Sequence, residues 1–238
     1  MRAVHSIALL GGVIGWVSGV LLRAGPMFVP GWQVPRALVV LVPWGPALAA
    51  TLSAATLLAG PLAAARMARL ADLAALGTVA ALVVSAGALR RAPRALPMLS
   101  RSRAEARIFR LGAVSALVAA LGAAGLALGA GAALAHHVLN DALRHLVTVG
   151  FLTSVVVAMT FRLIPVLEGV ALPWPGLRTV AFTALLGAVI LRTPQGLTIY
   201  GWPGLSPAVA LSGMLAWIAL AAVATTLAAV MIRGAIRP

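Results

Sequence analysis

The chain has 238 residues, of which 62% are hydrophobic and only 9% are charged, whereas an ordinary soluble domain has about 25% charged residues. Its net charge of +14 comes from 18 arginines, most of which lie between long apolar blocks, and this excludes a soluble nucleic-acid-binding domain with a basic face. The absence of cysteine also excludes disulfides, thiolate metal sites and cysteine nucleophiles.

The apolar residues form seven blocks, and about 20 such residues cross a hydrocarbon core about 30 Å thick. The predicted fold is therefore an all-α transmembrane bundle of about seven spans, with residues 1–238 forming a single integral membrane domain. The predicted spans are residues 4–22, 37–60, 71–89, 111–135, 141–167, 179–191 and 208–232. The sixth block is short, and it crosses the bilayer only if Arg178 and Arg192 extend their side chains to the two interfaces.

The arginines are divided unevenly between the two sides of this bundle. Five lie on one side: Arg2, Arg66, Arg69, Arg144 and Arg192. The other side has the remaining arginines, many of them in a basic loop at residues 90–110, which separates a first half (1–89) from a second half (111–238). The positive-inside rule then predicts an outside N-terminus and a cytoplasmic C-terminus, in the cytoplasmic (inner) membrane.

Glycines and prolines mark two further features of the spans. The first span has Gly11, Gly15 and Gly19 at four-residue spacing, and the fourth has Gly125 and Gly129. Such rows predict close helix packing. In the second span, Pro43 and Pro46 flank Trp44 and Gly45, and the missing N–H groups predict a kink or a break.

The first and fifth spans resemble each other, which indicates a possible parallel internal repeat of spans 1 to 3 and 5 to 7. In each, a histidine opens the span, an arginine closes it and a proline follows three residues later: His5, Arg23 and Pro26, and His145, Arg162 and Pro165. The second copy is offset from the first by four spans, an even number, so both helices run in the same direction. Both histidines are therefore expected near the outer face.

The four histidines are the candidate ligands of a metal cofactor, because neutral imidazole is the usual protein ligand of haem iron. His5 and His145 are expected to bind a haem b between them, with His136 and His137 in reserve. Gly12 and Gly19 project on the side of His5 and would leave room for a flat macrocycle. No catalytic residue is assigned.

Other polar residues near these positions have two interpretations each. Asp141 would join His137 and His145 on one helix face as a supporting carboxylate or part of a small metal site, but the favoured interpretation is an N-cap of the fifth span. Arg23 and Arg162 are expected to reach lipid phosphate, or else to pair with an anionic ligand. Met159 lies roughly 21 Å along the helix from His145, too far to bind the same iron.

The stretch DALRHLVTVGFLTSVVVAMTFRLIPVLEG resembles the NnrS family, membrane proteins linked to the nitric oxide response, and related patterns occur in subunit-I-like proteins of the haem-copper oxidase class. The matching residues are His145, Thr148 to Gly150, Met159 and Arg162. The resemblance implies haem and possible copper binding. Family members are usually longer, with more than one histidine in their early helix, and the segment after Arg162 differs here. Of the properties that the resemblance implies, copper binding is the one that these departures weaken most.

The expected function is haem b binding with a redox or nitric oxide-related role near the outer face. The expected partners are the lipid bilayer, other membrane subunits or a periplasmic electron carrier, with no nucleic acid. One alternative is a structural anchor subunit of a respiratory or photosynthetic membrane complex. Another is a small-molecule transporter, which the repeat and the broken second span favour, although no acidic residue is expected at mid-membrane.

Overall fold

The computed structural model describes residues 2–25, 33–89, 103–128, 140–195, 198 and 202–236. These residues are mostly helical and contain no β-strand. Among them, seven helical stretches are long and apolar enough to span a membrane: Val4–Ala24, Arg36–Ala55, Pro61–Ser85, Ala104–Ala127, Asn140–Leu167, Pro175–Arg192 and Ser206–Ala235. The predicted all-α architecture with seven spans is confirmed for this part of the chain, and such spans imply a lipid bilayer environment.

Three spans begin at least four residues earlier than predicted. The third begins at Pro61 instead of residue 71, the fourth at Ala104 instead of residue 111, and the sixth at Pro175 instead of residue 179. The prediction interrupted spans at arginines. Arginine is a good helix former, however, and its aliphatic stem lies readily along an apolar surface, so these helices continue through the arginines near their ends.

The chain divides into two compact units, which we describe separately. Unit 1 consists of Met1–Ala92 and Ala116–His136, and unit 2 of Pro93–Ser115 and His137–Pro238. The helix α6 (Arg103–Ala127) contributes its first part to unit 2 and its second part to unit 1.

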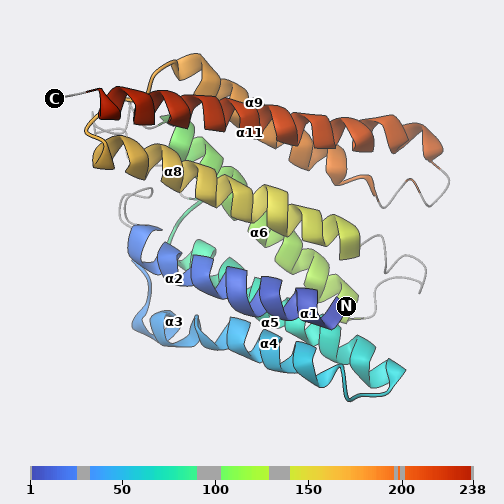
Figure 1. Ribbon diagram of the computed structural model, residues 1–238. Coiled ribbons are helices and arrows are strands. Elements are labelled where there is room, and N and C mark those ends of the chain that lie inside the picture. The colour runs from blue at the N-terminus through green and yellow to red at the C-terminus, as the bar shows by residue number, and fades with distance from the viewer. Residues whose placement is uncertain are drawn as a thin grey trace. The chain divides into compact units, whose positions relative to one another are not determined.

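Unit 1 is built from helices that pack closely through small residues. Its further elements are α1 (Arg2–Ser6), the π-helix η1 (Ile7–Val13), α2 (Ile14–Ala24), α3 (Arg36–Leu41), α4 (Trp44–Ala55) and α5 (Pro61–Ser85). α4 packs against both α5 and η1 (Figure 1). A Cβ on Gly11 would lie 2.6 Å from the Cβ of Ala50, and one on Gly15 would lie 3.2 Å from that of Pro46. The predicted close packing is confirmed at these two glycines.

The remaining glycines of the two rows are Gly19, Gly125 and Gly129. A Cβ on Gly19 or on Gly125 would meet no atom within 4 Å in the described part of the chain, and Gly129 lies outside the described residues. At Gly19 and Gly125 close packing is not seen among the described residues and stays a prediction. Four-residue spacing places glycines along one side of a helix, but it does not determine how far along that side the neighbouring helix stays in contact.

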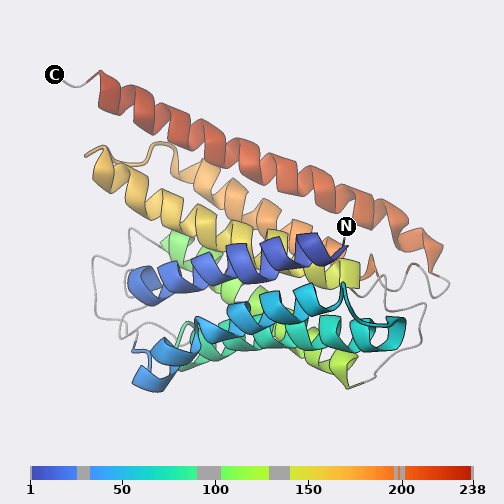
Figure 2. The same cartoon turned by 60° about the horizontal axis from the view of Figure 1, so that its bottom comes forward.

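The second span is broken where the sequence predicts it. α3 ends at Leu41 and α4 begins at Trp44, with Val42 and Pro43 in a turn between them. Figure 2 shows α3 and α4 as two successive blue segments of one span. Pro43 has no N–H to continue the helical hydrogen bonds. Just after the break, Gly45 packs so closely on Thr78 of α5 that an added Cβ would collide with the threonine side chain.

Unit 2 is organised around the fifth, sixth and seventh spans. Its further elements are the π-helix η4 (Leu146–Thr153), α8 (Ser154–Leu167), α9 (Pro175–Arg192), the short 3₁₀-helix η5 (Pro203–Leu205) and α11 (Ser206–Ala235). α9 and α11 lie side by side (Figure 1). Phe109 of α6, Phe151 of η4 and Phe161 of α8 are at most 1% exposed and form part of the core.

A π-helical segment follows the histidine in both the first and the fifth span. Ser6 separates His5 from η1, and His145 directly precedes η4. A π-helix bonds residue i to residue i−5, and such segments are frequent at functional sites. In each segment one glycine lies against a neighbouring helix: Gly11 against Ala50, and Gly150 against Ser115 of α6. Neither segment was predicted from the sequence.

A buried ion pair joins the first turns of α6 and α9 in unit 2. The Arg178 guanidinium donates to a carboxylate oxygen of Glu105 at 2.8 Å. The Glu105 side chain is 4% exposed and that of Arg178 is 17% exposed. That Arg178 extends to the interface stays a prediction; its guanidinium is bound to a protein carboxylate.

Candidate functional site

Of the four histidines predicted as ligands, the structure describes His5 and His145. His5 is exposed and lies in α1 of unit 1, whereas His136 and His137 lie outside the described residues. His145 is partly buried in unit 2, where residues 140–145 form the first helical turns of the fifth span. The predicted pairing of His5 with His145 joins residues of different units and stays a prediction.

The His145 ring is held by the preceding turn of its own helix. Its Nδ1 lies 2.8 Å from the backbone carbonyl oxygen of Asp141 and 3.6 Å from a carboxylate oxygen of the same residue. A carbonyl oxygen only accepts hydrogen bonds, so this contact requires the proton on Nδ1. Nε2 of the neutral ring then has a free lone pair. This is the usual arrangement of a histidine that binds a metal through Nε2.

Asp141 is itself fixed by two side chains from the end of the sixth span. Its Oδ2 accepts a hydrogen bond from Nε2 of Gln195 at 2.7 Å and lies 3.4 Å from a guanidinium nitrogen of Arg192. The helix already includes Asn140, so the favoured N-cap interpretation of Asp141 is wrong. A carboxylate in the first helical turn is stabilised by the helix dipole, and here it also borders the histidine.

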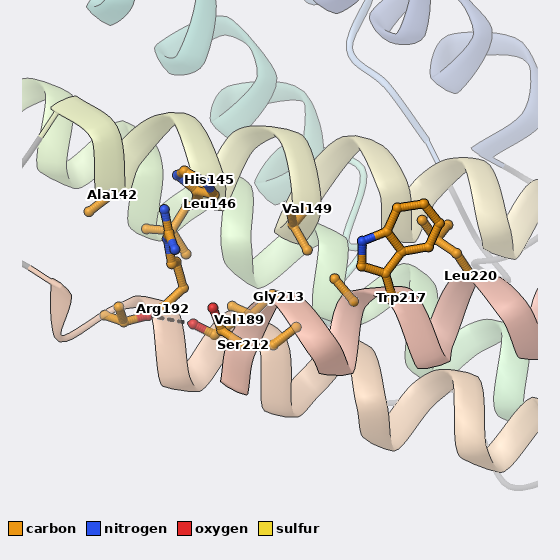
Figure 3. A pocket seen from close by; sticks show the side chains of 13 residues that line it. Ala142, His145, Leu146, Val149, Val189, Arg192, Ser212, Gly213, Trp217 and Leu220 are labelled. Atoms are coloured by element: carbon orange, nitrogen blue, oxygen red, sulfur yellow. Dashed lines mark hydrogen bonds between the residues drawn. The ribbon is translucent and has the colours of Figure 1, made fainter. Parts of the chain in front are cut away.

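His145 forms part of the wall of a cavity of about 220 Å³ inside unit 2. Three elements form this cavity: the start of the fifth span, the end of α9 and the first half of α11. Figure 3 shows the Arg192 side chain reaching from α9 toward His145, with Trp217 of α11 farther along the cavity. Much of the remaining wall is apolar and includes Leu146 and Val149.

The residues of this cavity fit one face of a haem. His145 supplies an oriented imidazole, and apolar side chains lie beside it. Enclosed ligand sites, however, typically have about 300–1,000 Å³, so 220 Å³ does not enclose a whole macrocycle within unit 2. A haem bound to His145 would therefore need protein groups outside this cavity to cover its other face.

The remaining predicted site residues are spread along the spans. Gly12 and Gly19 are exposed, and an added Cβ at either would meet nothing within 4 Å among the described residues. Arg23 is exposed near the end of α2, whereas Arg162 is partly buried in α8. Met159 is 9% exposed in α8. Arg162 and Met159 do not line the cavity beside His145, whereas Gly12, Gly19 and Arg23 belong to unit 1.

Sequence reasoning missed Gln195 and the neighbours that α11 contributes, Ser212 and Trp217. Gln195 lies just after α9, and nothing in its sequence neighbourhood indicates a bond to Asp141, 54 residues earlier. The sequence predicts Arg192 only at the end of the sixth span, with its side chain at the interface. Among the described residues, no group of three or more His, Cys, Asp or Glu side chains could hold a metal ion.

The fold defines the class of this chain: a polytopic α-helical membrane protein with seven helices of spanning length in its described part. Comparisons with protein-family models, with curated proteins and with solved structures find no match for the chain. The function proposed below therefore rests on the residues of the chain itself.

Proposed function

We propose that this chain binds haem b in the cytoplasmic membrane and acts in electron transfer or nitric oxide handling near the outer membrane face. The observation that carries the proposal is the His145 ring. Its Nδ1 bond to the Asp141 carbonyl leaves Nε2 as a ligand atom, and Asp141 is fixed in turn by Gln195. The neighbouring cavity wall is largely apolar.

The likeness between the first and fifth spans supports a role for His5 as the second ligand. Each histidine precedes a π-helical segment, and each segment has one glycine packed against another helix. Bound haem, held by His145 and His5, would supply a one-electron iron couple. Redox cycling needs an electron donor, so we expect a periplasmic carrier or a further membrane subunit as partner.

The test is the absorption spectrum of the protein purified in detergent from cells that make haem. We expect a reduced-minus-oxidised haem b difference spectrum that is lost in His145→Ala and in His5→Ala. Met159→Leu is the matched control, because Met159 is buried in the same span as His145 but lies away from the cavity. Its spectrum should be unchanged.

Two results would overturn the proposal. One is a wild-type protein that is folded, colourless and free of metal, which would favour the transporter. The other is a haem spectrum that stays the same in both histidine variants, which would place the haem on other ligands.

A further inference from the structure

Arg192 is the charged group of the cavity, and the contacts of its side chain leave part of its donor capacity unused. The side chain is 25% exposed. One guanidinium nitrogen lies 3.4 Å from Asp141, longer than the 2.7–2.9 Å of a strong charge-assisted hydrogen bond. Its Nε is buried and has no hydrogen-bond partner among the residues that the structure describes. A buried donor without an acceptor costs free energy, but the exposed quarter of the side chain is the part that an acceptor in the cavity reaches.

Asp141 uses only part of the donor capacity of this arginine, because the 3.4 Å contact involves one guanidinium nitrogen and an arginine side chain carries five N–H donors. Gln195 donates to Oδ2 of Asp141 at 2.7 Å, the same oxygen that Arg192 approaches. Asp141 is also 44% exposed, so solvent screens its charge. The guanidinium therefore keeps the capacity to bind a second anion.

The two hydroxyl groups of the wall do not compete for that role. The hydroxyl of Thr193 donates to the carbonyl of Val189, and that of Ser212 donates to the carbonyl of Val209, each within its own helix. Beyond them the wall is apolar toward Trp217. The cavity thus has a cationic end and an apolar body, a combination that complements an amphipathic carboxylate.

We propose that this cavity binds the carboxylate end of an amphipathic ligand, with the carboxylate on Arg192 and the apolar part along Val149 and Trp217. Two sources have this chemistry: a side-chain carboxylate of haem, which rests on the proposed function above, and a free fatty acid, which does not. The cavity volume of about 220 Å³ suits one end of either ligand.

The test compares Arg192→Gln with Arg144→Gln, an exposed arginine near the start of the fifth span that does not line the cavity. In the first arm, haem-loaded protein is mixed with an apo-globin that traps released haem. In the second arm, haem-free protein in neutral nanodiscs is titrated with oleate, and with oleyl alcohol as its uncharged analogue. Binding is followed by the change in tryptophan fluorescence. The part of the change that comes from Trp217 is the part that Trp217→Phe lacks.

Loss of one charge-assisted contact is expected to change binding about tenfold to a hundredfold. The carboxylate is assigned to haem if Arg192→Gln releases haem faster than wild type while Arg144→Gln does not, and if the wild type binds oleate no more tightly than oleyl alcohol. Tighter binding of oleate than of oleyl alcohol, lost in Arg192→Gln, assigns it to a fatty acid. The second result stands even if the protein never binds haem, so the two proposals fail separately.

The inference is overturned if Arg192→Gln matches wild type in both arms, or if Arg144→Gln has the same effect as Arg192→Gln. Arg192→Lys replaces the glutamine variant if that variant does not fold. Lysine keeps the charge but lacks the planar guanidinium fork, so it should weaken binding by a smaller factor and leave the preference for the carboxylate measurable.

Discussion

Glu105 and Arg178 meet where two helices of unit 2 begin, and their contact shows how a nearly apolar chain accommodates charge. The carboxylate lies in the first turn of α6, where the helix dipole favours a negative charge. The guanidinium lies in the first turn of α9, where it would be poorly placed alone. Together they form a 2.8 Å pair with a buried carboxylate and a largely buried guanidinium, so each residue depends on the other.

Removing one partner should therefore destabilise the protein more than removing both. We expect Glu105→Leu and Arg178→Met each to lower the free energy of unfolding by about 3 kcal/mol, because each leaves a buried charge unpaired. The double variant should lie within about 1 kcal/mol of wild type, since an apolar pair of similar volume replaces the ion pair. Denaturant titration of the purified protein in detergent measures these differences.

Arg107→Met is the control for this cycle, because Arg107 is exposed on the same helix. It should change the free energy of unfolding by less than about 0.5 kcal/mol. Additive effects of the two single substitutions would show that the side chains are not coupled, and would contradict the prediction.

At the scale of the element, the π-helix η4 combines an unusual backbone with a tight helix contact. A Cβ on Gly150 would lie 2.6 Å from Oγ and 2.7 Å from Cβ of Ser115 in α6. The Ser115 hydroxyl is buried and donates to the carbonyl of Leu111. The close approach of η4 to α6 thus requires a glycine on one side and tolerates only a small residue on the other.

Gly150→Ala should lower the free energy of unfolding by about 1–3 kcal/mol, the usual cost of overpacking. Ser115→Gly should restore much of this loss in the double variant, because it removes both atoms that the new methyl group meets. Gly125→Ala is the matched control, since its added Cβ meets no described atom within 4 Å, and alanine there should be neutral or stabilising. Equal losses for Gly150→Ala and Gly125→Ala would contradict this account.

The histidine-containing spans also show what the sequence could and could not predict. Alternating arginine-rich and apolar stretches predict the seven spans, and Pro43 predicts the break between α3 and α4. The π-helical segments are not visible in the sequence, because they depend on packing against neighbouring helices. Similarly, Arg192 and Gln195 reach Asp141 across more than 50 residues, and no local pattern encodes that contact.

At the scale of the whole molecule, the arginine distribution predicts an orientation. A green fluorescent protein fused after Pro238 should fluoresce, and an alkaline phosphatase fused at the same position should be inactive, because the C-terminus is expected in the cytoplasm. The reverse pair of results would place the basic loop at residues 90–110 outside and contradict the orientation. Fusions truncated within residues 129–139 serve as the control, since that connection is expected on the outer side.

The ion pair between α6 and α9 also has a consequence for how the chain is synthesised. Glu105 precedes Arg178 by 73 residues, so its helix leaves the ribosome while its partner is still untranslated. Until α9 follows, an unpaired carboxylate at the membrane border favours a position of α6 near water or lipid headgroups. Pairing with Arg178 removes that restriction, so the start of α6 becomes buried only after α9 has been synthesised.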